Sequence, residues 1–249
     1  MGYKEASPYR LFDIITQTGA AIAGYTETLC GEWCPERFER LGNALGVMCS
    51  NMILANEAHT DCVRIVDAAN SGYGVINKHD QNQFDAMITQ ETGMLLCVHT
   101  ADCVPLVLLD PTTHSAGIVH SGWVGTSNHI AGNAIKKMKE VFHCDAANMI
   151  CAMGPYNHSC CYEVGEDVLI AYRRSFSKQE CEMFFSKGQV EGKYMLNLGA
   201  AVSFSLCREG VPEKNIYDCG CCTFHTSMFS SWRRTGDSKR QMLTFIMLR

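Results

Sequence analysis

A cysteine and a histidine occupy positions that one short hairpin would bring together. The apolar runs 104–109 and 116–120 have the character of strands, and the polar stretch 110–115 between them has the composition of a turn. If the runs pair as an antiparallel hairpin, His120 lies opposite Pro105, and Cys103 is its diagonal neighbour on the same face. Such a thiol and imidazole could form a Cys–His catalytic pair or hold a metal ion.

A zinc ion that performs chemistry needs three protein ligands and one open position. His59 is the best third ligand among the nine histidines, because it lies in a polar turn between two strand-like runs, 52–55 and 62–66. The sequence therefore predicts a metal site made of His59, Cys103 and His120. Spacing alone leaves open that His59 is an ordinary surface residue.

A glycine-rich segment follows His120 and leads into a predicted helix. Gly122, Trp123 and Gly125 precede Ser127, which can cap a helix that extends to about Phe142. Backbone N–H groups and the helix dipole favour an anion there, so these residues are candidates for binding phosphate or carboxylate. The side chains expected to face inward are Ile130, Ile135, Met138, Val141 and Phe142.

The other cysteines are expected to pack in the core. The chain has 15 cysteines, an odd number that excludes complete pairing within one chain. Cys160 and Cys161 are adjacent, so their side chains should diverge, and the Cys219–Cys222 segment has no second pair at zinc-finger spacing. Cys30 and Cys34 likewise have no matching pair. This pattern is typical of thiols in a reducing compartment.

The elements that must position these residues mix without a regular βαβ rhythm, which predicts an α+β fold in one domain, residues 1–249. A helix should begin at Pro35 and end at Gly46. Further expected strands are 93–99, 149–153, 216–219 and 242–248, and further expected helices are 164–175 and 198–209.

Composition limits the function. Apolar residues make up 47% of the 249 residues and charged residues 19%, which excludes disorder as the main state. A net charge of −5 argues against a dedicated nucleic-acid binder. The first residues show no secretory signal, and no run reaches the length of a membrane helix, so a cytoplasmic protein is expected.

Several motifs together resemble the bacterial YfiH/laccase-domain family, often named multicopper polyphenol oxidase or purine nucleoside phosphorylase. The resemblance spans about residues 35–249, in the order and spacing of the family. Its central motifs are Thr100-Ala101-Asp102-Cys103-Val104-Pro105 and Val119-His120-Ser121-Gly122-Trp123. The others are Glu57-Ala58-His59-Thr60, Asp85-Ala86-Met87-Ile88-Thr89, Gly154-Pro155, Tyr162-Glu163-Val164-Gly165, Cys222-Thr223 and residues 229–234.

The resemblance implies a zinc, or historically copper, site on His59, Cys103 and His120. It also implies a single-domain α/β sandwich of mixed sheets with flanking helices, the CNF1/YfiH-like fold, and phosphorolysis of purine nucleosides together with adenosine deamination. The chain departs from the family at Val124, where arginine is usual, so a positive charge is missing beside the glycine-rich segment.

Three kinds of enzyme and one non-catalytic role fit these residues. In a zinc nucleoside enzyme, Cys103 and His120 would serve catalysis, Asp102 would move protons, and Arg233 or Arg240 would hold phosphate, although both arginines could instead form structural ion pairs. The alternatives are a copper polyphenol oxidase, a metal-independent Cys–His hydrolase, and a sensor or binding module. The expected partner is a small-molecule substrate, with no nucleic acid or membrane and with a possible homodimer.

Overall fold

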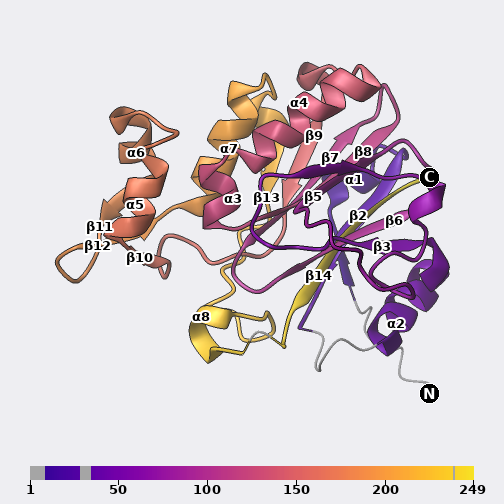
Figure 1. The fold of residues 1–249 in the computed structure, drawn as a ribbon, viewed down its shortest axis with the longest axis horizontal. Helices are drawn as coiled ribbons and strands as arrows, with labels where there is room; N and C mark the ends of the chain where they lie inside the picture. The colour runs from indigo at the N-terminus through magenta and orange to yellow at the C-terminus, as the bar shows by residue number, and fades with distance from the viewer. Residues whose placement is uncertain (1–8, 29–34, 238) are drawn as a thin grey trace.

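The computed structural model describes residues 9–28, 35–237 and 239–249, and its centre is a pair of stacked mixed sheets (Figure 1). The five-stranded sheet has the order β1 (Tyr9–Leu11), β2 (Ala21–Thr26), β14 (Met242–Leu248), β6 (Leu95–Thr100) and β3 (Met52–Leu54). The six-stranded sheet has the order β13 (Ile216–Asp218), β9 (Ile150–Met153), β7 (Val104–Asp110), β8 (Ser115–Ser121), β5 (Ala86–Thr89) and β4 (Val63–Ile65).

Alternation along β7 shows how the layers are held together. Leu106 and Leu108 belong to the apolar core shared with the helices, whereas Val107 and Leu109 belong to the core between the two sheets. Successive side chains of a strand point to opposite faces, so one fully apolar strand supplies two cores. This explains why the sequence shows a continuous apolar run there.

Helices cover both outer faces of the stacked sheets. On the six-stranded sheet lie α4 (Ile130–Phe142) and α7 (Leu198–Arg208), which contact each other (Figure 1). On the five-stranded sheet lies α2 (Pro35–Leu45), whose Phe38 and Leu41 are buried against it. The α2 helix ends where Gly46 adopts φ +72°, which agrees with the predicted boundary.

A smaller unit of two helices and one sheet lies at one side of the stacked sheets (Figure 1). It contains β10 (Glu163–Gly165), β12 (Lys193–Leu196) and β11 (Phe185–Lys187), with α5 (Glu166–Tyr172) and α6 (Lys178–Phe184). The remaining α-helices of the described residues are α1 (Asp13–Thr16), α3 (Trp123–Ser127) and α8 (Trp232–Thr235). Within the described ranges, no helix has both the length and the apolar character needed to cross a bilayer.

The predicted α+β sandwich is confirmed, but several details of the sequence prediction are wrong. The segment 164–175 begins as strand β10 before it becomes α5, and β2 and β5 were not predicted. Ser127 lies inside α3 and does not cap α4, whose first residue follows His129 in a left-handed conformation.

The burial of the cysteines also differs from the expectation of core packing. Cys62, Cys160 and Cys207 are exposed. Cys97, Cys144, Cys151, Cys181 and Cys222 are buried as expected. Cys30 and Cys34 lie outside the described residues.

The inner face of α4 gives a stability prediction. Met138 is fully buried against the six-stranded sheet, whereas Val141, which the sequence placed inward, is 37% exposed. Met138→Ala should lower the free energy of unfolding by about 2–5 kcal/mol through loss of buried contacts and a residual cavity. Val141→Ala is the control, and its cost should stay within about 1 kcal/mol. Urea unfolding followed by circular dichroism measures both, and equal costs would contradict the assigned helix face.

Candidate metal centre

The structure brings the three predicted ligands together from three separate elements. His59 lies in the loop between β3 and β4, Cys103 directly precedes β7, and His120 lies on β8. One ligand atom from each lies within 4.8 Å of the others. The distance from His59 Nε2 to Cys103 Sγ is 3.8 Å, and the two imidazole centroids are 4.9 Å apart.

The hairpin register that the sequence predicted is confirmed. β7 and β8 pair antiparallel with Pro105 opposite His120, and Asp110 pairs with Ser115 across the turn. His120 therefore points between the two sheets at the end of β8, on the side where the chain enters β7 after Cys103.

A buried carboxylate that the sequence analysis did not single out as a site residue positions two of the three candidate ligands. Asp85 Oδ1 accepts hydrogen bonds from His120 Nδ1 at 2.7 Å and from the His59 amide at 3.0 Å. Its Oδ2 accepts bonds from the Ala58 amide and from both the amide and the hydroxyl of Thr60. The signal in the sequence was an acidic residue immediately before a short apolar strand, residues 86–89.

These contacts determine the protonation of the site. Burial opposes ionisation of Asp85, but hydrogen bonds from His120 and Thr60 outweigh burial and lower its pKa to about 2. Burial also opposes the charged form of His120, yet the negative charges of Glu57 and Cys103 raise its pKa well above the usual value. For Cys103, burial is again outweighed, here by the charge of His120 and by hydrogen bonds from both histidines, and the pKa falls to about 6.

The Cys103 thiol is therefore held in a setting that favours the thiolate, which is the form that binds metals. Because Asp85 bonds His120 Nδ1, the other ring nitrogen, Nε2, is available to a metal ion. Two imidazoles and one thiolate are a donor set that zinc and copper both accept. By the chemistry of its donors, the site fits one such ion.

Gly122 is required by the packing of the ligands. A Cβ at this position would lie 2.7 Å from the His59 ring and 3.0 Å from Cys103 Sγ. Any larger residue would push both ligands apart, so the glycine permits the backbone to approach them. At Gly125, an added Cβ would lie 3.0 Å from the Thr60 carbonyl oxygen.

The ligands face a cavity of about 480 Å³, a size typical of small-molecule sites. Its walls include the aromatic side chains of Trp123, Tyr162 and Trp232. The other lining residues are Glu57, His59, His99, Thr100, Ala101, Asp102, Cys103, His120, Arg233 and Gln241. Of the predicted substrate-binding residues, Trp123 and Arg233 line this cavity, whereas Gly122, Gly125 and the exposed Arg240 do not.

Glu57 lines the cavity and is another acidic residue that the sequence analysis did not single out. Its Oε1 accepts a 2.6 Å hydrogen bond from the His99 amide, and burial raises its pKa to about 7. This hydrogen bond links β6, which contains His99, to the loop that carries both Glu57 and His59. His99, an unexpected polar residue in an apolar strand, also lines the cavity.

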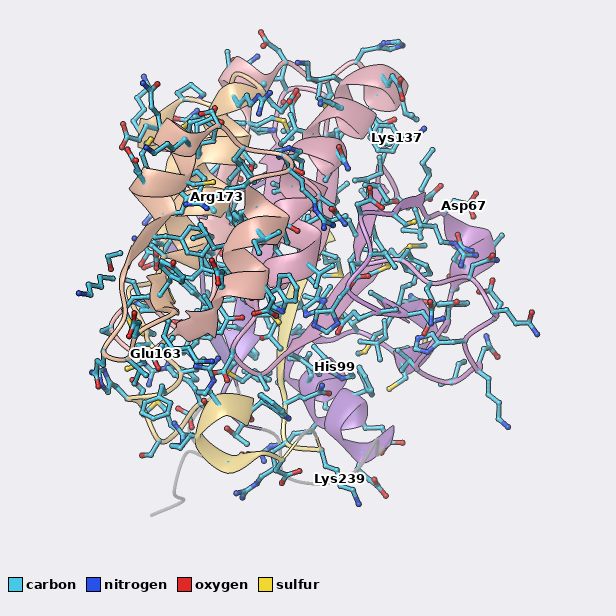
Figure 2. The ribbon with its side chains drawn as sticks, turned by 60° about the vertical axis from the view of Figure 1, so that its left-hand side comes forward. Asp67, His99, Lys137, Glu163, Arg173 and Lys239 are labelled. Carbon is cyan, nitrogen blue, oxygen red and sulfur yellow. The ribbon has the colours of Figure 1, made fainter. Side chains whose placement is uncertain are left out.

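Asp102 connects the site to the C-terminal segment. Its two carboxylate oxygens accept 2.6 Å hydrogen bonds from the Thr223 hydroxyl and the Arg233 amide. The Arg233 guanidinium lies 5.0 Å from the centroid of the Tyr162 ring and donates to the Glu163 carbonyl. Figure 2 shows Glu163 close to the helical turn α8, which carries Arg233. Asp102 adopts φ +95°, a left-handed conformation that residues other than glycine rarely adopt.

The glycine-rich segment after His120 is helical rather than a loop. Residues 123–127 form α3, a helix of 5 residues. The helix is interrupted at residues 128–129, and α4 begins after them. The long helix whose first turn was expected to bind an anion therefore does not begin here. Trp123 is in the first turn of α3 and turns its side chain to the cavity.

The fold and the site together define an α/β sandwich with a candidate metal centre between its sheets. The family model described as multi-copper polyphenol oxidoreductase laccase matches residues 34–249, and the chain belongs to this family. A crystal structure of the YfiH protein of Bacillus licheniformis superposes with a TM-score of 0.90, at 24% sequence identity, and covers 99% of this chain and 98% of that one. The expected YfiH-like fold is confirmed.

Two curated relatives are named as enzymes. A purine nucleoside phosphorylase from Clostridium acetobutylicum is 37% identical over 164 residues, which are 66% of each chain. An adenosine deaminase from an unknown prokaryotic organism is 30% identical over 211 residues, which are 83% of this chain and 78% of the relative. The chain is thus similar to enzymes that act on purine nucleosides.

The dependence of the ligands on Asp85 can be tested by mutation. Asp85→Asn should weaken the zinc binding that requires Cys103 by about 10–100-fold, because an amide cannot accept all the bonds that orient His59 and His120. Competition against a chromophoric chelator measures the affinity. Asp80→Asn is the matched control, since Asp80 bonds Tyr73 and Asn82 away from the ligands. An unchanged affinity in folded Asp85→Asn would contradict the positioning role.

Proposed function

We propose that this protein is a zinc-dependent purine nucleoside phosphorylase with adenosine deaminase activity. The observation that carries the proposal is the convergence of His59, Cys103 and His120 in one cavity with three aromatic side chains and an arginine. The names of the two relatives support the same substrate class.

The residues of the cavity have different proposed roles, which follow from their side-chain chemistry. His59, Cys103 and His120 would hold the zinc ion, which supplies Lewis acidity and lowers the pKa of water toward about 7. Trp123, Tyr162 and Trp232 offer flat apolar faces against which a purine can stack. Asp102, predicted as a proton carrier, already accepts bonds on both oxygens, so we assign it the positioning of Arg233.

A neighbouring cavity suits the phosphate. It measures about 440 Å³ and shares Trp123, Tyr162 and Arg233 with the first cavity. Lys193 adds a second cation to its wall, which also carries the acidic residues Glu163 and Asp167. A guanidinium can bind two phosphate oxygens at once, and an ammonium adds a point charge. Arg233 therefore lies where phosphate and nucleoside would meet.

The two reactions differ in nucleophile. In phosphorolysis, a phosphate oxygen bonds to C1′ of the ribose, the glycosidic C–N bond breaks, and the purine leaves with its electron pair and takes up a proton. In deamination, water adds to C6 of adenosine and ammonia leaves, which gives inosine. Only the first reaction consumes phosphate.

The function is tested by incubating the purified protein with inosine or adenosine, with and without phosphate. We expect hypoxanthine or adenine plus ribose 1-phosphate only when phosphate is present, and ammonia from adenosine in either case. Cys103→Ala should lose both activities, because it removes the thiolate ligand. Products no greater than in this variant would contradict the proposal. If the enzyme keeps its activity when a chelator removes the metal but loses it when the thiols are alkylated, the result would support the metal-independent Cys–His hydrolase.

The role of Arg233 has its own test. Arg233→Lys should raise KM for phosphate about tenfold or more, because a lysine cannot make the bidentate contact, while ammonia release from adenosine stays near wild type. Arg240→Lys should leave KM unchanged, since Arg240 is not among the residues that line either cavity. Steady-state kinetics at varied phosphate decides between the two arginines, and an effect confined to Arg240→Lys would reverse the assignment.

A copper oxidase is the second candidate, favoured by the description of the family model and by a donor set that also suits copper. A multicopper cluster that reduces O₂ needs many imidazoles. In the described part of the chain, the two groups of potential ligands contain three histidines, His59, His120 and His225. Metal content after expression without added copper separates the candidates, since several copper ions per chain would favour the oxidase.

A further inference from the structure

A second group of potential metal ligands lies outside the cavity. Cys160 and Cys161 follow β9 in the connection to β10, and Cys222 and His225 lie between β13 and α8. One ligand atom from each of the four residues lies within 4.8 Å of the others. The sequence treated the adjacent cysteines as diverging and all three cysteines as core thiols. The structure contradicts the first expectation, and it contradicts the second for Cys160, which is exposed, and for Cys161, which is half-buried.

Four of the six distances between the ligand atoms of this group are close to those of a tetrahedron around a thiophilic ion. Zinc bonds of about 2.3 Å to sulfur and about 2.0 Å to nitrogen place tetrahedral ligand atoms about 3.5–3.8 Å apart. Cys160 Sγ lies 3.5 Å from Cys161 Sγ and 3.9 Å from Cys222 Sγ. His225 Nδ1 lies 3.8 Å from Cys160 Sγ and 3.9 Å from Cys161 Sγ, and the other ring nitrogen, Nε2, lies 3.2 Å from Cys161 Sγ.

We propose that Cys160, Cys161, Cys222 and His225 bind a second zinc ion, separate from the candidate catalytic metal. Three thiolates and one imidazole complete a tetrahedral shell and leave no open position, which is the mark of a structural site. The three thiols are free in this structure, since their sulfur atoms lie 3.5–3.9 Å apart and a disulfide bond is about 2.05 Å long. Only Cys222 is buried, so core packing does not explain the convergence of the other three.

The second site joins two loops that build the cavity. Cys161 precedes Tyr162, whose ring lines the cavity, and Cys222 precedes Thr223, whose hydroxyl bonds Asp102. Between the loops, the backbone contributes two hydrogen bonds, from Tyr156 to Cys221 and from Thr223 to Tyr156. A zinc ion bound to both loops would fix the wall that carries Tyr162 relative to Asp102. Its role is to position these residues.

Zinc counting by mass spectrometry tests the site. The wild-type chain should hold two zinc ions. Cys161→Ser and Cys103→Ala should each hold one, because each removes a ligand from a different set. Cys221→Ser is the matched control and should keep two, since its thiol contacts the Cys219 carbonyl rather than the group. Equal zinc content in wild type and Cys161→Ser would overturn the second site, whereas zinc unchanged in Cys103→Ala would count only against the proposed function.

Cobalt substitution separates metal binding from packing and from oxidation. In Cys103→Ala loaded with Co²⁺, the sulfur-to-cobalt absorption per ion should be about threefold that of Cys161→Ser, because three thiolates remain instead of one. His225→Cys should retain the ion and strengthen this absorption, a rescue that a packing role does not predict. Equal absorption in the two variants would overturn the proposal. So would a wild-type chain that lacks the second metal and whose mass is lower by two hydrogens, because that mass change indicates a disulfide.

Discussion

The buried carboxylate of Asp85 is the interaction on which the candidate catalytic site depends. It accepts five hydrogen bonds, from the loop 58–60 and from His120, so one side chain fixes two ligands that are far apart in sequence. A buried charge is costly unless it is fully hydrogen-bonded, and here the bonds come from groups that the site itself needs. The loop has no regular secondary structure to hold it, and without Asp85 the His59 backbone, at φ +60°, would lose its anchor.

The position of Asp85 follows from the sheet. It stands at the start of β5, whose pairing with β8 puts Ala86 opposite Val119 and Asp85 beside His120. The same β8 pairs with β7, which delivers Cys103. Three neighbouring strands thus bring a carboxylate, a thiol and an imidazole to one end of the sheet. The rigid sheet sets their spacing, and the loops supply the rest of the cavity wall.

The C-terminal part of the chain supplies a further part of the cavity wall, with Trp232, Arg233 and Gln241. Thr223 and Arg233 reach Asp102, and Arg234 donates to the Thr223, Phe224 and Phe229 carbonyls, so the irregular segment before α8 is held by charged hydrogen bonds. The proposed second zinc site would add a metal clamp between this segment and the loop before Tyr162. The hydrogen bonds and the proposed zinc site would have the same effect. They would connect the loops of the cavity wall, which regular secondary structure does not hold together.

The sequence by itself determined the parts that depend on local pattern. Alternation and turn chemistry predicted the β7–β8 hairpin with its register, and hence the approach of Cys103 and His120, because a hairpin is a contact between near neighbours along the chain. The α2, α7 and β14 segments followed from the same periodicities. The family motifs pointed to His59, and a single domain with a possible homodimer remains a prediction.

Only the tertiary structure decided which distant residues share a site. Asp85 reaches His59 and His120 from a separate strand, and Glu57 bonds the His99 amide of β6. The four residues of the second group join loops about sixty residues apart, so no local spacing reveals these contacts. Tertiary packing also broke the helix after His120 and turned Val141 outward. The physical reason is the same in each case: patterns along the chain encode which face of an element is apolar, whereas the order of strands in the sheets decides which polar side chains meet.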